Sequence, residues 1–268
     1  MKFETVGDIR SPAVIMLNGS FTTGQGLREI AERLSDTFYV ILPTYDGHYE
    51  QGGEFTTRED QAAQLLRYCA DNAIEEIALL HGLSMGAEIA LDLFARACRE
   101  ETLRIHQCLL DGGPFFSLPF LGRLALRRVF RRLVSALRGK TISQVMASRR
   151  SSRGLRRMLG AELPQYREMI EDMLQAVPCM SDRSVDREAD ACCSFDFPAI
   201  RPEMQQKLYF TWSVNESARR SRKKMERLYP GAVFADAGND GHCGLMLRQP
   251  ENYAALMRTL ASSALRTE

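Results

Sequence analysis

The sequence predicts an α/β fold, in which helices flank a mostly parallel central sheet and a helical segment is inserted after the strand that ends near Asp111. Short apolar runs alternate with longer amphipathic stretches, which is the pattern of βα units. The alternation stops after Asp111, where helical signals continue to about Ala191. A length of 268 residues fits one large domain or a domain with a substantial insertion. We therefore expect a core of residues 1–114 and 201–268 and a helical cap of residues 115–200.

Six apolar runs have the length and composition of buried strands. They lie at residues 13–17, 38–42, 76–80, 105–110, 207–212 and 232–235. Pro43 is expected to close the second strand. Apolar residues recur at helical spacing between these runs and after the last one. The expected helices of the core are 25–34, 57–73, 84–99, 218–228 and 251–265.

Composition excludes several classes of protein. Apolar residues make up 45% and charged residues 26% of the chain, as in a soluble globular protein. The seven cysteines include no C-x-x-C pair, so neither a disulfide framework nor a metal site is expected. No signal peptide or membrane-length apolar run is found, which favours a cytoplasmic location. A net charge of +1 argues against nucleic acid as a partner.

The charge is unevenly distributed. Residues 112–161 carry twelve basic side chains and no acidic one, so the remaining chain carries a net charge of −11. Within this segment an apolar stripe between arginines predicts an amphipathic helix over about 118–137. The stripe is Leu126, Phe130, Leu133 and Leu137. The arginines have three possible roles. They could pair with the acidic half of the cap, contact an anionic membrane surface weakly, or attract an acidic substrate or nucleic acid. No nucleic-acid-binding motif supports nucleic acid as the partner.

The segment Gly82–Gly86 matches the pattern G-x-S-x-G. An apolar strand at 77–80 precedes it and a helical stretch at 87–97 follows, which is the strand, sharp turn and helix of a nucleophile elbow. Small residues are needed two positions before and after the serine so that strand and helix can pack closely, and the two glycines satisfy this need. Ser84 is therefore the candidate nucleophile, the alternative being an ordinary helix N-cap.

A serine hydroxyl needs a base within hydrogen-bond reach, and histidine is the usual one. His242 is the candidate, because the glycine-rich loop 238–244 follows the last strand and can bring its imidazole over the carboxyl edge of the sheet. His48, in the loop after the second strand, is an alternative. His81 and His106 lie on predicted strands and are expected to be structural.

The base needs a carboxylate that fixes its tautomer. Glu216 follows the fifth predicted strand, and the order Ser84, Glu216, His242 is the chain order of nucleophile, acid and base that this arrangement requires. Asp111, directly after the fourth strand, is the alternative acid. Asp240 is a third candidate, although its place favours a turn.

Negative charge on the substrate oxygen requires two N–H donors, which together form an oxyanion hole. The backbone N–H of Met85, next to Ser84, is the first candidate. The second should come from the turn after the first strand, where Ser20 is favoured and Phe21 is the alternative.

On these residues the sequence resembles the α/β-hydrolase superfamily of serine hydrolases with a helical cap. The resembling segments are Leu17-Asn18-Gly19, residues 43–48, 82–86 and Gly241-His242, with the insertion at the place of the family's cap. The resemblance implies acyl transfer to water through an acyl-enzyme, without a cofactor. Three positions depart from the family pattern, since Asn18 replaces a histidine, Ala87 replaces a glycine and Ser213 replaces the glycine three residues before the acid. The acid itself is usually aspartate in the family, whereas the candidate here is Glu216.

Two classes of function follow from these observations. The first is a serine hydrolase that cleaves a small carboxylic ester, with thioesterase, amidase or peptidase, and acyltransferase as close relatives. The second is a catalytically silent protein of the same fold that binds a small molecule or a partner. The complete set of Ser84, Glu216 and His242 favours the enzyme, and the oligomeric state stays open.

Overall fold

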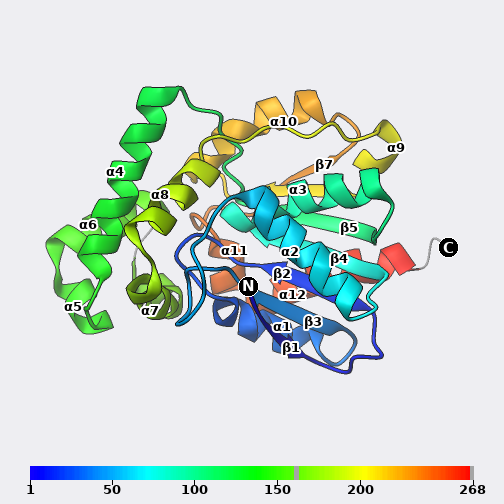
Figure 1. The fold of residues 1–268 in the computed structure, drawn as a ribbon, viewed down its shortest axis with the longest axis horizontal. Helices are drawn as coiled ribbons and strands as arrows, with labels where there is room; N and C mark the ends of the chain where they lie inside the picture. Colours follow the sequence, from blue (N-terminus) through cyan, green and yellow to red (C-terminus); the bar gives the residue numbers. More distant parts are fainter. Residues whose placement is uncertain (160–162, 266–268) are drawn as a thin grey trace.

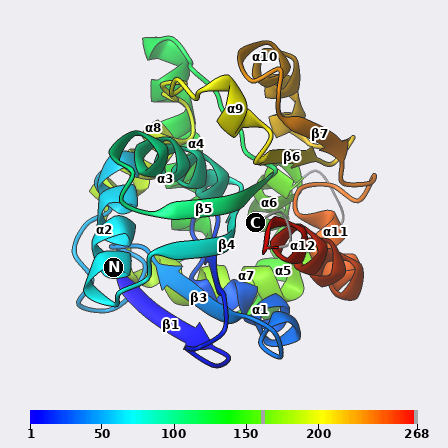
Figure 2. The same cartoon turned by 90° about the vertical axis from the view of Figure 1, so that its right-hand side faces the viewer.

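The computed structural model describes residues 1–159 and 163–265. Its strands form one sheet in the order β1-β3-β2-β4-β5-β6-β7, with β1 antiparallel to β3 and the other pairs parallel. The strands are β1 (Lys2–Val6), β2 (Ala13–Leu17), β3 (Tyr39–Thr44), β4 (Glu76–Leu83), β5 (Arg104–Asp111), β6 (Leu208–Trp212) and β7 (Val233–Asp236). Figure 2 shows them stacked in this order between two layers of helices.

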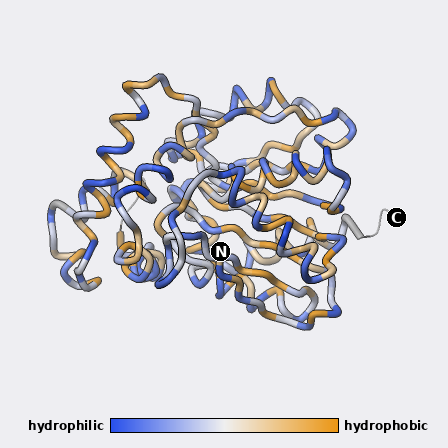
Figure 3. The backbone as a smooth tube through the Cα atoms, viewed as in Figure 1, coloured by the Kyte–Doolittle hydropathy of each residue, from blue (hydrophilic) through white to orange (hydrophobic). Residues whose placement is uncertain are grey.

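The core helices cover both faces of the sheet. Successive residues of a strand point to opposite faces, so Ile15 and Leu80 pack on the side of α3 while Met16 and Leu79 pack on the side of α12. Figure 3 shows hydrophobic residues concentrated in the strands and on the inner sides of the helices. The core helices are α1 (Arg28–Leu34), α2 (Arg58–Asp71), α3 (Met85–Glu100), α9 (Pro202–Gln205), α10 (Arg222–Leu228), α11 (Gly244–Arg248) and α12 (Pro250–Leu265), with 3-10 turns at Gly24–Leu27 and Ser217–Ser221.

The segment of residues 120–159 and 163–191, between β5 and β6, is helical and gathers at one end of the sheet (Figure 1). Its helices are α4 (Phe120–Leu137), α5 (Ile142–Ala147), α6 (Arg149–Leu159), α7 (Arg167–Ala176) and α8 (Asp182–Ala191), with 3-10 turns at Leu163–Tyr166 and Val177–Cys179. Three of the four predicted stripe residues of α4, namely Phe130, Leu133 and Leu137, are buried. The flank of α4 next to this stripe pairs with α8, because Arg127 binds Asp190 and Arg131 binds Asp186. These pairs agree with the first interpretation of the basic segment.

All six strands expected from the sequence are present, with two corrections. The expectation that Pro43 ends its strand is wrong, because β3 continues to Thr44. β2 pairs with β3 only from Tyr39 to Ile41, so Pro43 lies beyond the part of β3 that is paired on both sides, where a missing N–H is tolerated. β1 was not predicted, because this strand lies at the edge of the sheet and its Lys2 and Glu4 interrupt an apolar run.

Within the described ranges no helix is long and apolar enough to cross a membrane. The same part of the chain contains no group of three or more histidine, cysteine, aspartate or glutamate side chains that could hold a metal ion.

Candidate active site

Ser84 lies at the sharp turn between β4 and α3. Its backbone has φ 56° and ψ −120°, a left-handed conformation that is costly for a residue with a side chain. The Ser84 N–H donates a hydrogen bond of 2.7 Å to the carbonyl oxygen of Asp111 at the end of β5. The neighbouring strand therefore holds the strained turn and presents the serine at the carboxyl edge of the sheet.

The two glycines of the elbow are required by close packing. A Cβ atom on Gly82 would lie 2.3 Å from the carbonyl oxygen of Gly86. One on Gly86 would lie 2.5 Å from the carbonyl oxygens of Leu17 and Asn18, in the turn after β2. The steric argument made from the sequence is confirmed, since no larger residue fits either position without moving the backbone.

The imidazole of His242 contacts the carboxylate of Glu216 through Nδ1 and Oε2. The other carboxylate oxygen of Glu216 accepts a hydrogen bond of 2.6 Å from the backbone N–H of Ser213, which fixes the acid. Gly112, at φ 62°, lies against both side chains, because a Cβ atom there would be 2.8 Å from His242 Cε1 and 3.2 Å from Glu216 Oε2. Ser84 and His242 thus contact consecutive residues at the end of β5: the backbone of Ser84 binds Asp111, and the side chain of His242 packs on Gly112.

The pKa of His242 is raised well above its ordinary value. Burial alone would lower this pKa, and it is the Cys243 sulfur and the Glu216 carboxylate that reverse the effect. Burial also raises the pKa of the Cys243 thiol, which is therefore neutral near pH 7 and attracts the imidazolium weakly. We assign the raised pKa of His242 to Glu216.

Asp111, the alternative acid, has other partners. Its two oxygens accept hydrogen bonds from Thr211 Oγ1 at 2.7 Å and from the hydroxyl of Tyr253 at 2.9 Å. Burial raises the pKa of Asp111 to about 6, against the effect of these hydrogen bonds. The Tyr253 hydroxyl also lies 2.8 Å from Nε2 of His81, so Asp111 belongs to a buried network beneath the site.

The remaining candidates have structural surroundings. Asp240 pairs with Arg248 at the surface, as a turn residue would. The alternative base His48 is fully buried against Glu188 of α8, with 2.5 Å between Nε2 and Oε1. His106 faces Glu76 across neighbouring strands. None of these contacts involves Ser84.

The turn after β2 lies beside the serine. A Cβ atom on Gly19 would be 3.2 Å from the Cβ atom of Ser84. The side chain of Asn18 spans the turn and donates a hydrogen bond of 2.6 Å to the carbonyl oxygen of Thr22. The hydroxyl of Ser20 is 3.5 Å from the sulfur of Met85, so the two residues proposed as oxyanion donors are neighbours.

Phe21, the alternative donor, has φ 65° and is fully buried. Its ring meets Phe130 of the cap edge to face, with 4.8 Å between the ring centroids. The turn that carries the candidate oxyanion donors is thus covered directly by the apolar stripe of α4.

Two residues that were not predicted from the sequence, Leu159 and Tyr166, hold the histidine loop. The N–H of His242 donates to the carbonyl oxygen of Leu159 at 2.9 Å, at the end of α6. The hydroxyl of Tyr166 lies 2.8 Å from the carbonyl oxygen of His242 and 3.2 Å from that of Asp240. The two Tyr166 contacts join a side chain to backbone about 75 residues away, and the Leu159 contact joins two distant backbone groups, so no local sequence pattern predicts them.

The model of the Alpha/beta hydrolase family matches residues 14–256 of the chain. The chain belongs to this family. Membership supports a hydrolase as the class of enzyme. No curated protein matches the sequence significantly.

Solved structures show the same fold for nearly the whole chain. A putative alpha/beta hydrolase family protein from Desulfitobacterium hafniense is 16% identical, with a TM-score of 0.75 over 97% of this chain and 99% of that one. A thermophilic esterase from Thermogutta terrifontis is 20% identical, with a TM-score of 0.73 over 98% and 93% of the two chains. An enol-lactonase from Burkholderia xenovorans is 14% identical, with a TM-score of 0.73 over 97% and 96%.

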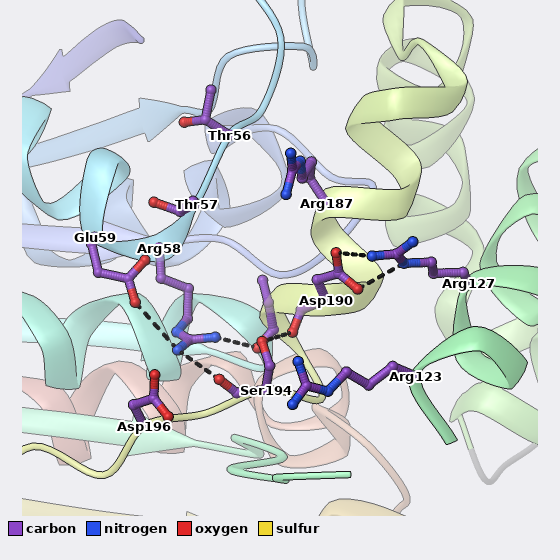
Figure 4. A pocket seen from close by; sticks show the side chains of 11 residues that line it. Thr56, Thr57, Arg58, Glu59, Arg123, Arg127, Arg187, Asp190, Ser194 and Asp196 are labelled. Atoms are coloured by element: carbon purple, nitrogen blue, oxygen red, sulfur yellow. Dashed lines mark hydrogen bonds and ion pairs between the residues drawn. The ribbon is translucent and has the colours of Figure 1, made fainter. Parts of the chain in front are cut away.

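In this alpha/beta hydrolase, buried polar contacts join the cap to the core. Asp172 of α7 accepts hydrogen bonds from the N–H and the hydroxyl of Thr23, at 2.8 and 2.5 Å. Arg58 of α2 donates to the carbonyl oxygens of Ala191 and Ser194 after α8, beside a cavity of about 340 Å³ (Figure 4). Neither Ser84 nor His242 lines this cavity.

Proposed function

We propose that the protein is a serine hydrolase that cleaves the carboxylic ester of a small molecule, with Ser84 as nucleophile, His242 as base and Glu216 as the acid that orients it. The observation that carries the proposal is the pairing of His242 with Glu216, both of which pack on Gly112. The residue before Gly112, Asp111, binds the strained turn that carries Ser84. A binding protein would have no need for this pairing beside a strained serine.

In the proposed reaction the Ser84 hydroxyl oxygen attacks the ester carbonyl carbon while its proton passes to Nε2 of His242. The backbone N–H groups of Met85 and Ser20 stabilise the oxyanion. Collapse of the tetrahedral intermediate breaks the bond to the leaving alkoxide, which takes the proton from His242. Water then attacks the acyl-enzyme with His242 again as base, releasing the carboxylic acid and restoring Ser84.

The surroundings of the turn favour a hydrophobic acyl group. Phe21 on the core side and Phe130 on the cap side meet in an edge-to-face contact above the turn that carries Ser20. Leu133, one turn further along α4, is also buried on this side. A cap that closes over the acyl group would exclude water from the acyl-enzyme, and it must move aside to admit the ester.

Labelling with a fluorophosphonate tests the proposal. The reagent should form a covalent adduct on the peptide that contains Ser84, detected by mass spectrometry, and Ser84→Ala should abolish it. Ser152→Ala, on the cap helix α6, is a matched control that should keep the label. Absence of labelling in a folded protein, or labelling that survives Ser84→Ala, would contradict the proposal and favour a silent binding protein. A panel of esters, thioesters and amides then identifies the preferred bond.

A further inference from the structure

The N-terminal end of α4 exposes large apolar side chains. Phe120 and Leu121, the first two residues of α4, are each 75% exposed. Figures 1 and 2 place this end of α4 at an outer edge of the molecule, away from the sheet. An exposed aromatic and an exposed leucine side by side on a projecting helix end are unfavourable in water and indicate a surface that is covered in use.

Cations follow the apolar tip along the same face of the helix. Leu121, Arg128 and Arg132 are spaced i, i+7 and i+11, which places them on one stripe. Arg127 and Arg131 on the neighbouring stripe are paired with α8, whereas within the described residues Arg128 and Arg132 have no carboxylate partner. At 1.5 Å per residue, Arg128 lies about 10 Å along the axis from Leu121.

We propose that this surface of α4, the apolar tip of Phe120 and Leu121 together with the stripe of Arg128 and Arg132, docks the protein on an anionic lipid surface. The apolar tip has the size to enter the boundary between headgroups and acyl chains, which is about 5–10 Å deep. The two arginines would then lie at the level of the lipid phosphates, where each basic residue strengthens binding.

Charge favours lipid over a second copy of this chain. A two-fold interface would set this face against itself and bring the same arginines together. Residues 112–161 contain no acidic residue that could relieve this repulsion within the segment, while the rest of the chain is net negative. An anionic surface therefore attracts this basic segment.

Vesicle flotation tests the docking surface without reference to catalysis. The full chain is mixed with vesicles of phosphatidylcholine alone, or of phosphatidylcholine with about 30 mol% phosphatidylserine. We expect binding to the anionic vesicles only, weakening between about 0.05 and 0.5 M NaCl as charges are screened. Ser84→Ala should bind as the wild type does, so a failure of the proposed enzymatic function would leave this result intact.

Two double variants separate the parts of the surface. Phe120→Ser with Leu121→Ser removes the apolar tip, and Arg128→Glu with Arg132→Glu reverses the charge. Each should weaken binding to anionic vesicles about tenfold or more. The matched controls are Val214→Ser with Leu228→Ser and Arg67→Glu with Arg227→Glu, which alter exposed residues elsewhere and should bind like the wild type.

Three outcomes would overturn the proposal. The first is wild-type protein that does not float with anionic vesicles. The second is equal binding by the wild type and both α4 variants. The third is a wild-type dimer, detected by sedimentation, that Phe120→Ser with Leu121→Ser dissociates, since the tip would then be an interface between copies.

Discussion

The hydroxyl of Tyr166 donates a hydrogen bond to the backbone carbonyl oxygen of His242, at 2.8 Å. Tyr166 lies between α6 and α7 and His242 in the loop after β7, so the proposed base is held by a residue of the segment inserted between β5 and β6. The hydroxyl is also within 3.2 Å of the carbonyl oxygen of Asp240, and the His242 N–H bonds Leu159. Tyr166 and Leu159 therefore hold the backbone of the loop that carries the imidazole.

Tyr166→Phe should lower kcat for a soluble ester about 10- to 100-fold with little change in KM, because a loosened loop misplaces the base. The ring stays packed, and one lost hydrogen bond costs about 0.5–1.5 kcal/mol of stability. The rate of fluorophosphonate labelling should fall in parallel with kcat. Tyr49→Phe, which removes a comparable hydroxyl from the core, is the control. A lowered melting temperature with unchanged kcat would assign Tyr166 a purely structural role.

Glu216→Gln should lower kcat about 10³- to 10⁴-fold, since an amide favours the wrong tautomer of His242. Asp111→Asn should cost less than about tenfold, because its partners are Thr211 and Tyr253 and their hydroxyls can also bond an amide. Steady-state kinetics of both variants on one ester decide between the two acids. Near wild-type activity in Glu216→Gln together with inactive Asp111→Asn would move the acid to Asp111.

The pH dependence follows from the raised pKa of His242. A general base acts in its neutral form, so kcat/KM should rise with pH through an apparent pKa above the ordinary 6.5. Glu216→Gln removes the charge that stabilises the imidazolium, and the residual activity should then rise at lower pH than in the wild type. Profiles measured on a substrate whose leaving group does not titrate test both statements. An apparent pKa at or below 6.5 in the wild type would show that burial, not Glu216, dominates.

Phe130→Ala should reduce kcat/KM for long-chain p-nitrophenyl esters about tenfold more than for the acetate, because burial of one large side chain is worth about 1.5–3 kcal/mol. This prediction is based on the contact of Phe130 with Phe21, in the turn that carries the candidate oxyanion donors. Val129→Ala, an exposed neighbour on the same helix, should leave the chain-length profile unchanged. A uniform loss at all chain lengths in Phe130→Ala would mean that the stripe stabilises the cap without touching the acyl group.

The strands were predictable because a buried parallel strand is a continuous apolar run. The glycine at 82 is required by backbone atoms of its own turn, whereas the glycine at 86 is required by the turn after β2, which is distant in sequence, so only the G-x-S-x-G pattern revealed it. β1 was missed for a related reason. Its burial is partial at the edge of the sheet, so Lys2 and Glu4 interrupt the apolar pattern on which the prediction rests.

The sequence by itself determined the order Ser84, Glu216, His242, the strand and turn that carry the serine, and the amphipathic character of α4. It left Glu216 and Asp111 open, because both follow neighbouring strands and end at the same edge of the sheet. Only the tertiary structure brings Glu216 to His242 and gives Asp111 to Thr211 and Tyr253. Contacts such as that of Tyr166 with His242 are decided by how the cap packs on the core, and this packing depends on the combined burial of many side chains, which no short segment encodes.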